Sequence, residues 1–464
     1  MAIPFKITHV LMITTLITAC STVDEDADNS VAEHDVELIE LESELRGRGP
    51  RPRRGRATPP RRPRPVPPAP PSRPAPEPEP EVEEEPEPLS YDSDMIQDVL
   101  NLPSDPYNYD PQNIPVAFAR EAALVDNTPN DNLLDDRRAT LGRVLFYDTL
   151  LSANEEISCA SCHRQEIGFT DDAQFSEGFE GGLTGRNSMS LINLRYYANG
   201  AMFWDERALT LEHQVLMPIQ DAVEMGVSLE ELVSRVENSS YYPALFTLTF
   251  GDPQVTSERI SLALANFVRS ITSHNSPYDR GLTQAGGNPR PPFVNFSAEE
   301  NRGKDLFFGG QNGGANCAVC HLAPAPGAPR GPGNPPPTSI FFVNGVSNNG
   351  LTDGSGADED LGRGGVSGRA QDDGKFKSPS LRQTALTGPF MHDGSLETLR
   401  DVIDHYSEGI QAHPNLDPRL RQGRNGPPQR LNLSVADKEA LEAFLHALTD
   451  EGVSTDERFS NPFH

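Results

Sequence analysis

Basic residues are scarce in this sequence. Its 464 residues include 39 lysines and arginines against 68 aspartates and glutamates, which gives a formal net charge of −29. Because so negative a surface is repelled by phosphates, the composition argues against nucleic acid as a partner and favours a basic protein partner. The length and the 36% of hydrophobic residues are enough for two or three folded domains of ordinary size.

Long hydrophobic runs are also lacking. The apolar run at residues 10–17 is too short to remain in a bilayer as a helix. It follows Lys6 and precedes small residues and Cys20, which is the layout of an export signal. We therefore expect residues 1–20 to be a lipoprotein-type signal peptide and the rest of the chain to be exported, with no other membrane-spanning segment.

The end of this signal also predicts a lipid modification. The sequence ITAC at residues 17–20 resembles a bacterial lipobox, whose cysteine becomes the lipidated first residue of the mature protein. Since Ser21, and not an aspartate, follows Cys20, the sorting rule for lipoproteins favours the outer membrane. We expect a periplasmic protein tethered to the outer membrane through Cys20. The alternative is an ordinary cleaved signal in which the cysteine is incidental.

Residues 21–88 are poor in side chains that could form a core. Sixteen of the 43 prolines lie between Pro50 and Pro88, where a basic block (RGRGPRPRRGR) changes to an acidic one (PEPEPEVEEEPEP). Such a segment buries too little apolar surface to offset its ordering entropy. We expect a disordered Pro/Arg/Glu-rich linker, which serves either as a stalk or as a tolerated low-complexity insert.

From about residue 91 the pattern becomes helical, interrupted by Gly and Pro loops. Residues 139–151 and 256–271 carry apolar side chains at helical spacing, and residues 296–308 begin with a capping box at Ser297 and Glu300. Another helix is expected to open at Ser434. Because neither a hairpin series nor an alternating strand–helix rhythm appears, the sequence predicts a mainly α-helical fold, with a domain boundary near residue 290.

Cysteine is scarce too, and its placement is informative. Four of the five cysteines fall in two copies of CxxCH, in which two thiols can add to one haem while the adjacent histidine ligates its iron. A four-cysteine zinc site does not need the histidines, and a redox dithiol expects a thioredoxin-like context that is missing. The sequence therefore predicts two covalently bound c-type haems, held by Cys159, Cys162 and His163 and by Cys317, Cys320 and His321.

Longer segments resemble one protein family. They are residues 141–163 (LGRVLFYDTLLSANEEISCASCH), GRNSMSLIN, AMFWDERALTLEHQVLMPIQDAVEMG, SPYDR and FKSPSLRQTALTGPFMHDGSLETLRDVIDHY. Over residues 95–450 they resemble, in the same order, the bacterial diheme cytochrome c peroxidases and their relative MauG. The resemblance implies two cytochrome c-like haem domains packed against each other: an N-terminal peroxidatic domain (89–290) and a C-terminal electron-transfer domain (291–464).

The resemblance also implies roles for single residues. His163 would hold the peroxidatic haem, and His321 the haem through which electrons enter. Trp204, the only tryptophan, matches the residue between the haems, although a lone tryptophan is more often a core aromatic. Gln214 and Glu224 match the distal-pocket residues, where a poorly solvated carboxylate suits proton transfer in peroxide cleavage. The alternative for Glu224 is a capping or ion-pair role on a surface turn.

A calcium site is implied in the same way. Asn187, with the backbone carbonyls of Thr387 and Pro389, matches a calcium site that lies between the domains of the family. Ligation by oxygen alone suits this hard cation. Without the resemblance, the three oxygens could equally serve turns.

One departure from the peroxidase pattern concerns the first haem. Many of the peroxidases place a histidine about sixteen residues after the first CxxCH, where it blocks the peroxidatic iron. Here no histidine occurs between His163 and His213. We therefore expect this haem to be five-coordinate without reductive activation, unless His213 swings in.

A second departure concerns the other haem. Tyr406 stands where the peroxidases carry a methionine ligand, and MauG uses tyrosine there, so the resemblance implies that His321 and Tyr406 are the axial pair. Met391 is the alternative ligand, because thioethers are ordinary ligands of c-type haems. If neither residue is a ligand, Met391 is core filler and Tyr406 a buried aromatic. His392 and His405 flank the two and could be structural or secondary ligands.

These features imply an enzyme that reduces hydrogen peroxide to water with electrons from a small cytochrome c or cupredoxin, and the net negative charge favours a basic donor. A MauG-like oxidase that modifies side chains of a partner protein is one alternative, supported by Tyr406 and the missing histidine. A non-catalytic diheme electron carrier is another, against which Glu224 and Gln214 argue. Membrane contact is expected only through the lipid anchor, and a homodimer is an open alternative to a monomer.

Overall fold

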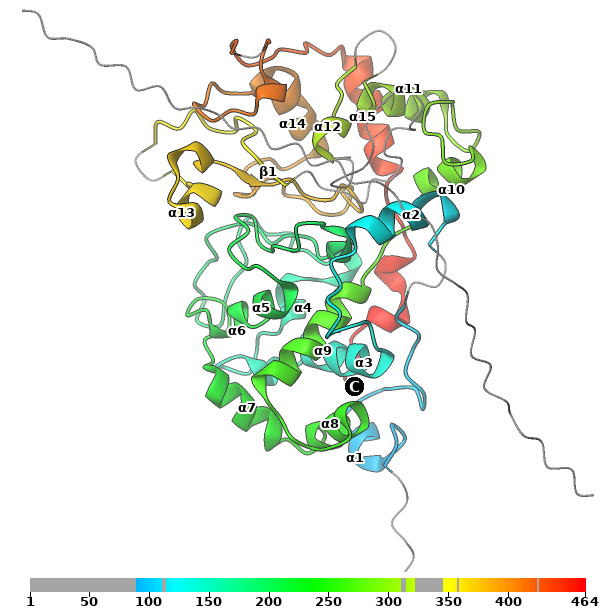
Figure 1. Cartoon of the computed structure of the whole chain (residues 1–464), viewed down its shortest axis with the longest axis vertical. Helices are drawn as coiled ribbons and strands as arrows, with labels where there is room; N and C mark the ends of the chain where they lie inside the picture. The colour runs from blue at the N-terminus through cyan, green and yellow to red at the C-terminus, as the bar shows by residue number, and fades with distance from the viewer. Residues whose placement is uncertain (1–88, 111–113, 310–313, 322–344, 357–358, 424) are drawn as a thin grey trace, which may run out of the picture. The chain divides into compact units, whose positions relative to one another are not determined.

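The computed structural model describes residues 89–110, 114–309, 314–321, 345–356, 359–423 and 425–464 (Figure 1). All of them belong to one compact unit. The expected signal peptide (1–20), its lipidated Cys20 and the expected linker (21–88) lie outside the described residues. Within the described ranges, no helix combines the length and the apolar character that crossing a membrane requires.

Helices supply most of the regular structure in the described ranges. The first ten α-helices are α1 (Asp94–Gln97), α2 (Val116–Val125), α3 (Asp136–Tyr147), α4 (Cys159–Cys162), α5 (Leu211–Gln214), α6 (Met217–Gln220), α7 (Leu229–Glu237), α8 (Tyr242–Phe250), α9 (Ser257–Ser270) and α10 (Pro277–Gln284). They are followed by α11 (Ala298–Phe307), α12 (Ala318–His321), α13 (Arg363–Ser367), α14 (Leu399–Asp404) and α15 (Val435–His446). The one sheet described is an antiparallel pair, β1 (Val346–Ser347) and β2 (Phe376–Lys377).

Shorter helical turns connect these elements. The 3₁₀ turns are η1 (Thr149–Leu151), η2 (Gln165–Ile167), η3 (Leu194–Tyr196), η4 (Ala370–Asp372), η6 (Pro418–Leu420), η7 (Val453–Thr455) and η8 (Glu457–Phe459). The turn η5 (His405–Gly409), which continues α14, is a π-helix. Such π turns inside helices are frequent at functional sites.

Two helix pairs repeat one arrangement. Helix α3 packs against α9, and α11 packs against α15 (Figure 1). Each pair meets at a glycine: a Cβ atom on Gly142 would lie 2.0 Å from the carbonyl oxygen of Ala263, and one on Gly303 would lie 1.8 Å from that of Ala440. Only a residue without a Cβ atom allows the backbones to approach so closely.

The sequences around the two glycines match as well. Gly142 opens the segment GRVLFY and Gly303 opens GKDLFF, and each segment leads toward one CxxCH. The basic residue after each glycine is buried and bonded to a backbone carbonyl: Arg143 Nε donates to Ser460 at 2.6 Å, and Lys304 Nζ donates to Pro291 at 2.8 Å. The repeat therefore extends from the helix pair to the segment that precedes each CxxCH.

Buried apolar side chains gather in two main clusters. The first surrounds α3 and α9 and includes Phe146 and Phe267, and the second surrounds α11 and α15 and includes Phe307 and Phe444. The chain crosses between them near both ends. Phe118 of α2 packs in the second cluster, whereas Phe459 of η8 packs in the first, against Phe169 and Phe267.

The mainly α-helical class predicted from the sequence is confirmed, with very little sheet in the described residues. Four helices expected from apolar spacing and capping residues are present as α3, α9, α11 and α15. Thr256 caps α9 by accepting from the Arg259 N–H, and Ser297 and Glu300 form the expected capping box of α11. The division into two haem domains near residue 290 stays a prediction.

Candidate functional site

The first CxxCH forms α4 and leaves its histidine with one ring nitrogen engaged. His163 Nδ1 donates to the backbone carbonyl of Phe169 at 3.0 Å, and the hydroxyl of Ser188 lies 3.3 Å from the same nitrogen. Because a carbonyl can only accept, the proton sits on Nδ1 and the lone pair on Nε2 is available to a metal. Burial lowers the pKa of His163, which keeps the ring neutral, as a ligand must be.

A small cavity of about 70 Å³ adjoins this segment. Cys159, Cys162 and His163 border it. Gln214, from the end of α5, and Glu224, from the loop after α6, border it as well, together with Pro218 of α6. The structure thus brings together residues that the sequence separates by as many as 65 positions, in the grouping that the resemblance implied.

Glu224 has an electrostatic setting suited to holding a proton. Burial raises the pKa of its carboxyl group, the negative charge of Asp221 raises it further, and the guanidinium of Arg207 offsets part of the increase. The loop around residue 179 packs closely on the Glu224 loop: the Phe179 N–H donates to the Glu224 carbonyl oxygen at 3.2 Å. A poorly solvated carboxyl group of this kind is suited to accept a proton and return it.

No histidine among the described residues lines this cavity apart from His163. The sixteenth residue after His163 is Phe179, on the loop that packs against Glu224. His213 is exposed and does not border the cavity, although its neighbour Gln214 does. In this structure Gln214 and Glu224 therefore share the cavity with His163, and no second imidazole among the described residues borders it.

The second CxxCH repeats the geometry of the first. Cys317 precedes α12, which carries Cys320 and His321. His321 Nδ1 donates to the carbonyl of Pro379 at 3.1 Å, so that Nε2 again carries the free lone pair. Burial lowers the pKa of His321 to about 4 and raises that of Cys317 to about 12. A neutral imidazole and two unionised thiols are thus gathered at one buried place.

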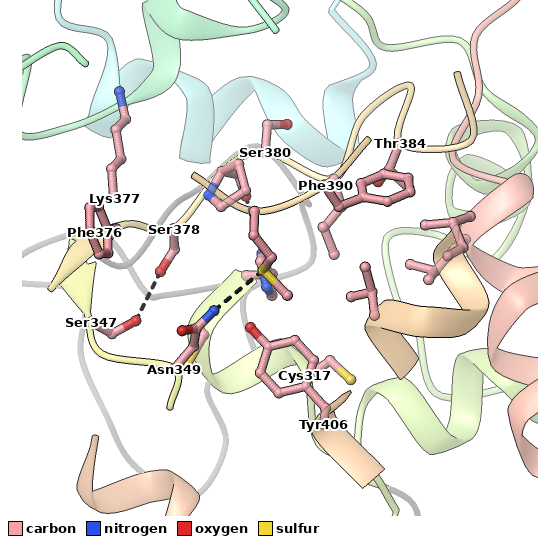
Figure 2. Close-up of a pocket in the computed structure, with 18 of the residues that line it drawn as sticks. Cys317, Ser347, Asn349, Phe376, Lys377, Ser378, Ser380, Thr384, Phe390 and Tyr406 are labelled. Atoms are coloured by element: carbon pink, nitrogen blue, oxygen red, sulfur yellow. Dashed lines mark hydrogen bonds between the residues drawn. The ribbon is translucent and has the colours of Figure 1, made fainter. Parts of the chain in front are cut away.

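A larger cavity, of about 390 Å³, adjoins this second segment. Its walls include the three residues of the motif and both candidate sixth ligands, Tyr406 and Met391. Figure 2 shows the phenol of Tyr406, from the π-helical turn η5, pointing toward Asn349. The amide of Asn349 in turn donates to the sulfur of Met391 at 3.3 Å, drawn as a dashed line in Figure 2.

The two histidines that flank these candidates differ in position. His405 Nε2 lies 3.1 Å from the carbonyl oxygen of Asn349, and His405 does not border the cavity. His392 does border it, with its ring stacked on Phe376 at a centroid distance of 3.6 Å. The structure therefore places His405 in a structural hydrogen bond and leaves His392 beside the cavity.

Trp204 also borders the larger cavity, where it is anchored at two points. Its indole N–H donates to the carbonyl of Asn187 at 2.9 Å, and its own carbonyl accepts from the Lys377 N–H at 2.7 Å. Next to it, Arg186 joins Asp205 at 2.5 Å to Asp360 at 2.6 Å. These contacts fix the tryptophan between segments that precede and follow the second CxxCH.

The three residues of the expected calcium site border this same cavity. The side-chain nitrogen of Asn187 donates to the carbonyls of Ala173 and Gln174, both at 3.2 Å, so its amide oxygen points away from them. The described residues contain no group of three histidine, cysteine or acidic side chains that could hold a metal ion. A calcium ion here would depend on the amide oxygen of Asn187 and the carbonyls of Thr387 and Pro389.

Sequence reasoning missed a buried polar cluster beside Trp204. Tyr197 and Lys377 line the larger cavity, and Glu206 lies behind them, bonded to the phenol of Tyr197. Burial lowers the pKa of Lys377 to about 7. The only signals in the sequence were the charged run at residues 205–207 in FWDERA and the lysine in FKSPS.

Comparisons with known proteins match this arrangement. The family model described as "Di-haem cytochrome c peroxidase" matches residues 136–286. The methylamine utilization protein MauG of Methylophilus methylotrophus is 33% identical over 323 residues, which cover 69% of this chain and 84% of that protein. Cytochrome-c peroxidase IdrP2 of Denitromonas iodatirespirans is 30% identical over 348 residues, which cover 72% of this chain and 88% of that protein.

A solved structure agrees with these relatives. A MauG-like protein associated with microbial copper homeostasis superposes with a TM-score of 0.60 at 33% identity, over 77% of this chain and 99% of that one. The family implies two c-type haems and an oxidoreductase activity, and both CxxCH segments fit the haems because each sets two thiols and a free imidazole nitrogen at a cavity. The chain therefore belongs to the bacterial family of di-haem cytochrome c peroxidases and MauG.

Proposed function

We propose that this protein reduces hydrogen peroxide to water at the cavity beside His163, with electrons that arrive through the site of His321. The observation that supports the proposal is the meeting of Gln214 and Glu224 with the first CxxCH around one small cavity. The electron donor in this proposal is a small cytochrome c or cupredoxin, and the net charge of −29 favours a basic one.

In this mechanism, bound c-type haems would supply the iron that takes up peroxide and the store from which electrons are drawn. Cys159 and Cys162 would anchor the first haem, and His163 would be its proximal ligand. Glu224 takes a proton from one oxygen of peroxide and returns it to the other, which leaves as water. Gln214 orients the peroxide by hydrogen bonding, and the small size of the cavity excludes bulk water.

The second site has a different task in the proposal. Cys317, Cys320, His321 and Tyr406 would hold the second haem, which would then pass charge and not bind peroxide. Trp204 lies on the wall of the same cavity and is held rigidly by its two hydrogen bonds. It would carry charge between the two sites.

The test is a donor assay on the holoprotein. Ferric protein is mixed with peroxide and a reduced basic cytochrome c, and donor oxidation is followed by absorbance. We expect Glu224→Gln to slow this reaction by roughly 10²–10⁴-fold, the usual contribution of a general acid–base group. The control is Glu180→Gln, which removes an exposed carboxylate from the neighbouring loop. Equal rates for the two variants would contradict the role of Glu224.

A second candidate is a MauG-like oxidase that modifies side chains of a partner protein. It is favoured by the position of Tyr406 on the second cavity, by the absence of a histidine between His163 and His213, and by the relatives named MauG. Rapid turnover with the basic cytochrome supports the peroxidase. Negligible donor turnover, while peroxide still changes the haem spectrum, supports the oxidase.

Two further features belong to the proposal. Calcium would bind Asn187, Thr387 and Pro389, and prolonged chelation should lower both bound calcium and the peroxide-dependent rate.

Export and anchoring to the outer membrane would depend on Cys20. Replacement of Cys20 by serine should move the protein from the membrane fraction to the soluble periplasm, while an unchanged distribution would contradict lipidation.

A further inference from the structure

Glu206 occupies a position that an acidic residue rarely takes. It is only 5% exposed, and its backbone has a φ of +56°, in the left-handed region that costs a non-glycine residue energy. Its carboxylate accepts hydrogen bonds from the phenol of Tyr197 and from the side-chain amide of Asn199, the latter at 2.8 Å. A buried carboxylate on a strained backbone points to a function beyond packing.

Tyr197 connects this carboxylate to the cavity. Its ring is 2% exposed and lines the same wall as Trp204. Lys377 links the two aromatic residues: its Nζ lies 3.8 Å from the centroid of the Tyr197 ring, and its backbone N–H donates to the Trp204 carbonyl at 2.7 Å. Tyr197 is therefore a phenol with a proton acceptor at its hydroxyl, and it shares a cavity and a contact with Lys377 with the proposed charge-carrying tryptophan.

We propose that Tyr197 and Glu206 form a redox-active pair that holds one oxidising equivalent during the reaction with peroxide. Tyr197 gives one electron to the oxidant generated from hydrogen peroxide at the haems, and its phenolic proton moves along the hydrogen bond to Glu206. The products are a neutral tyrosyl radical and a protonated carboxyl group. An electron from the donor, together with the proton held by Glu206, restores the phenol.

The surroundings explain why the proton must move with the electron. Lys377 Nζ lies 3.8 Å from the ring centroid and, whenever it is protonated, opposes any positive charge left on the ring. Transfer of the proton to Glu206 keeps the ring neutral, so that oxidation becomes feasible. This inference rests on the proposed function, because peroxide supplies the oxidant.

Two other buried tyrosines provide matched controls. Tyr196 is adjacent in sequence and also 2% exposed, yet it does not line the cavity. Tyr242 likewise donates to a buried carboxylate, that of Asp148 at 2.7 Å, and lines neither of the two cavities described above. Tyr196 is thus a neighbour of Tyr197 that does not reach the cavity. Tyr242 has a carboxylate partner, as Tyr197 does, but lies away from the cavity.

The experiment is freeze-quenched paramagnetic resonance of the ferric holoprotein mixed with hydrogen peroxide, without a donor. We expect an organic radical signal that narrows when the protein contains ring-deuterated tyrosine. Tyr197→Phe should abolish it, whereas Tyr196→Phe and Tyr242→Phe should keep it. Glu206→Gln should reduce its yield, because the amide can accept the hydrogen bond but cannot take the proton. The haem absorbance of each variant verifies folding and haem loading.

The outcomes separate the inference from the proposed function. If peroxide changes the haem spectrum but no tyrosyl signal appears, or the signal persists in Tyr197→Phe, the inference fails and the proposed function stands. A full signal in Glu206→Gln also overturns the pairing. If peroxide leaves the haem spectrum of the unmodified protein unchanged, the proposed function fails and the inference fails with it.

Discussion

The side-chain amide of Asn349 donates a hydrogen bond to the sulfur of Met391 at 3.3 Å, on the wall of the cavity that Tyr406 also borders. Burial raises the pKa of Tyr406, and the thiol of Cys320 adds to this, while a hydrogen bond from Asn349 lowers it in part. Asn349 thus occupies one lone pair of the thioether and offsets part of the rise in the pKa of the phenol. This relationship supports the proposal that Tyr406, and not Met391, would ligate the haem at His321.

Replacing Tyr406 tests that assignment. Tyr406→Phe should remove the tyrosinate-to-iron absorption and raise the reduction potential of the second haem, because an anionic oxygen ligand stabilises ferric iron. Resonance Raman and a spectroelectrochemical titration measure the two effects. Met391→Leu is the matched control and should leave both unchanged. The opposite result, a change only in Met391→Leu, would show that the methionine is the ligand.

Glu224 should reduce the stability of the fold at neutral pH. Because folding raises its pKa above the ordinary value of 4.5, the folded state favours the protonated carboxyl group. The free energy of unfolding therefore falls as pH rises from 4.5 through the raised pKa of the folded state. Glu224→Gln should raise the melting temperature at pH 7 while slowing peroxide reduction. A melting temperature that falls at pH 7 would contradict the stated origin of the pKa shift.

Removing the charge of Asp221 or that of Arg207 should shift the pH–rate profile in opposite directions, because the two charges act oppositely on the pKa of Glu224. The charge of Asp221 raises the pKa of Glu224 and that of Arg207 lowers it. Since Glu224 must be ionised to accept a proton, the rate should rise with pH through this pKa. Asp221→Asn should move the rising limb of the pH–rate profile to lower pH, and Arg207→Gln should move it to higher pH. Shifts in the same direction would show that these charges do not act through Glu224.

The glycines at the two helix crossings should resist substitution. Gly142→Ala and Gly303→Ala each place a Cβ atom within about 2 Å of a backbone oxygen, at 2.0 and 1.8 Å, and should cost at least ~1–3 kcal/mol of the free energy of unfolding, the usual range for overpacking. Gly185→Ala is the control, because a Cβ atom there meets nothing within 4 Å. Urea unfolding of the holoprotein measures all three, and equal stability of the three variants would contradict the crossing geometry.

The sequence predicted what local patterns encode. Helix α11 was expected because Ser297 and Glu300 satisfy backbone groups within four residues of each other, and both haem segments were expected because CxxCH is contiguous. The meeting of Gln214 and Glu224 at the first cavity followed from the resemblance. Glu206 was not singled out, because neither its hydrogen bond with Tyr197, nine positions earlier, nor its positive φ follows from a sequence motif.

The pairing of Arg382 with Asp279 also could not be predicted from the sequence, although the motifs that contain them, SPSLR and SPYDR, were both noted there. The two residues are 103 positions apart, each is 1% exposed, and Arg382 Nη2 donates to Asp279 Oδ1 at 2.6 Å. Nothing within either motif specifies a partner at that separation. Only the packing of α10 beside the segment after β2 brings the charges together, which makes the pair a test of the tertiary fold.

Asp279→Asn should cost about 3–5 kcal/mol of the free energy of unfolding, because it leaves the guanidinium of Arg382 buried without a countercharge. Glu231→Gln, at the solvent-exposed ion pair with Arg235, is the control and should cost no more than ~0.5 kcal/mol. Replacing Asp279 by Leu and Arg382 by Met together should recover most of the loss, since no unpaired charge remains. Urea unfolding measures the three variants. A double variant as unstable as Asp279→Asn would mean that the pair stabilises the fold through its hydrogen bonds and shape, and not through charge neutralisation.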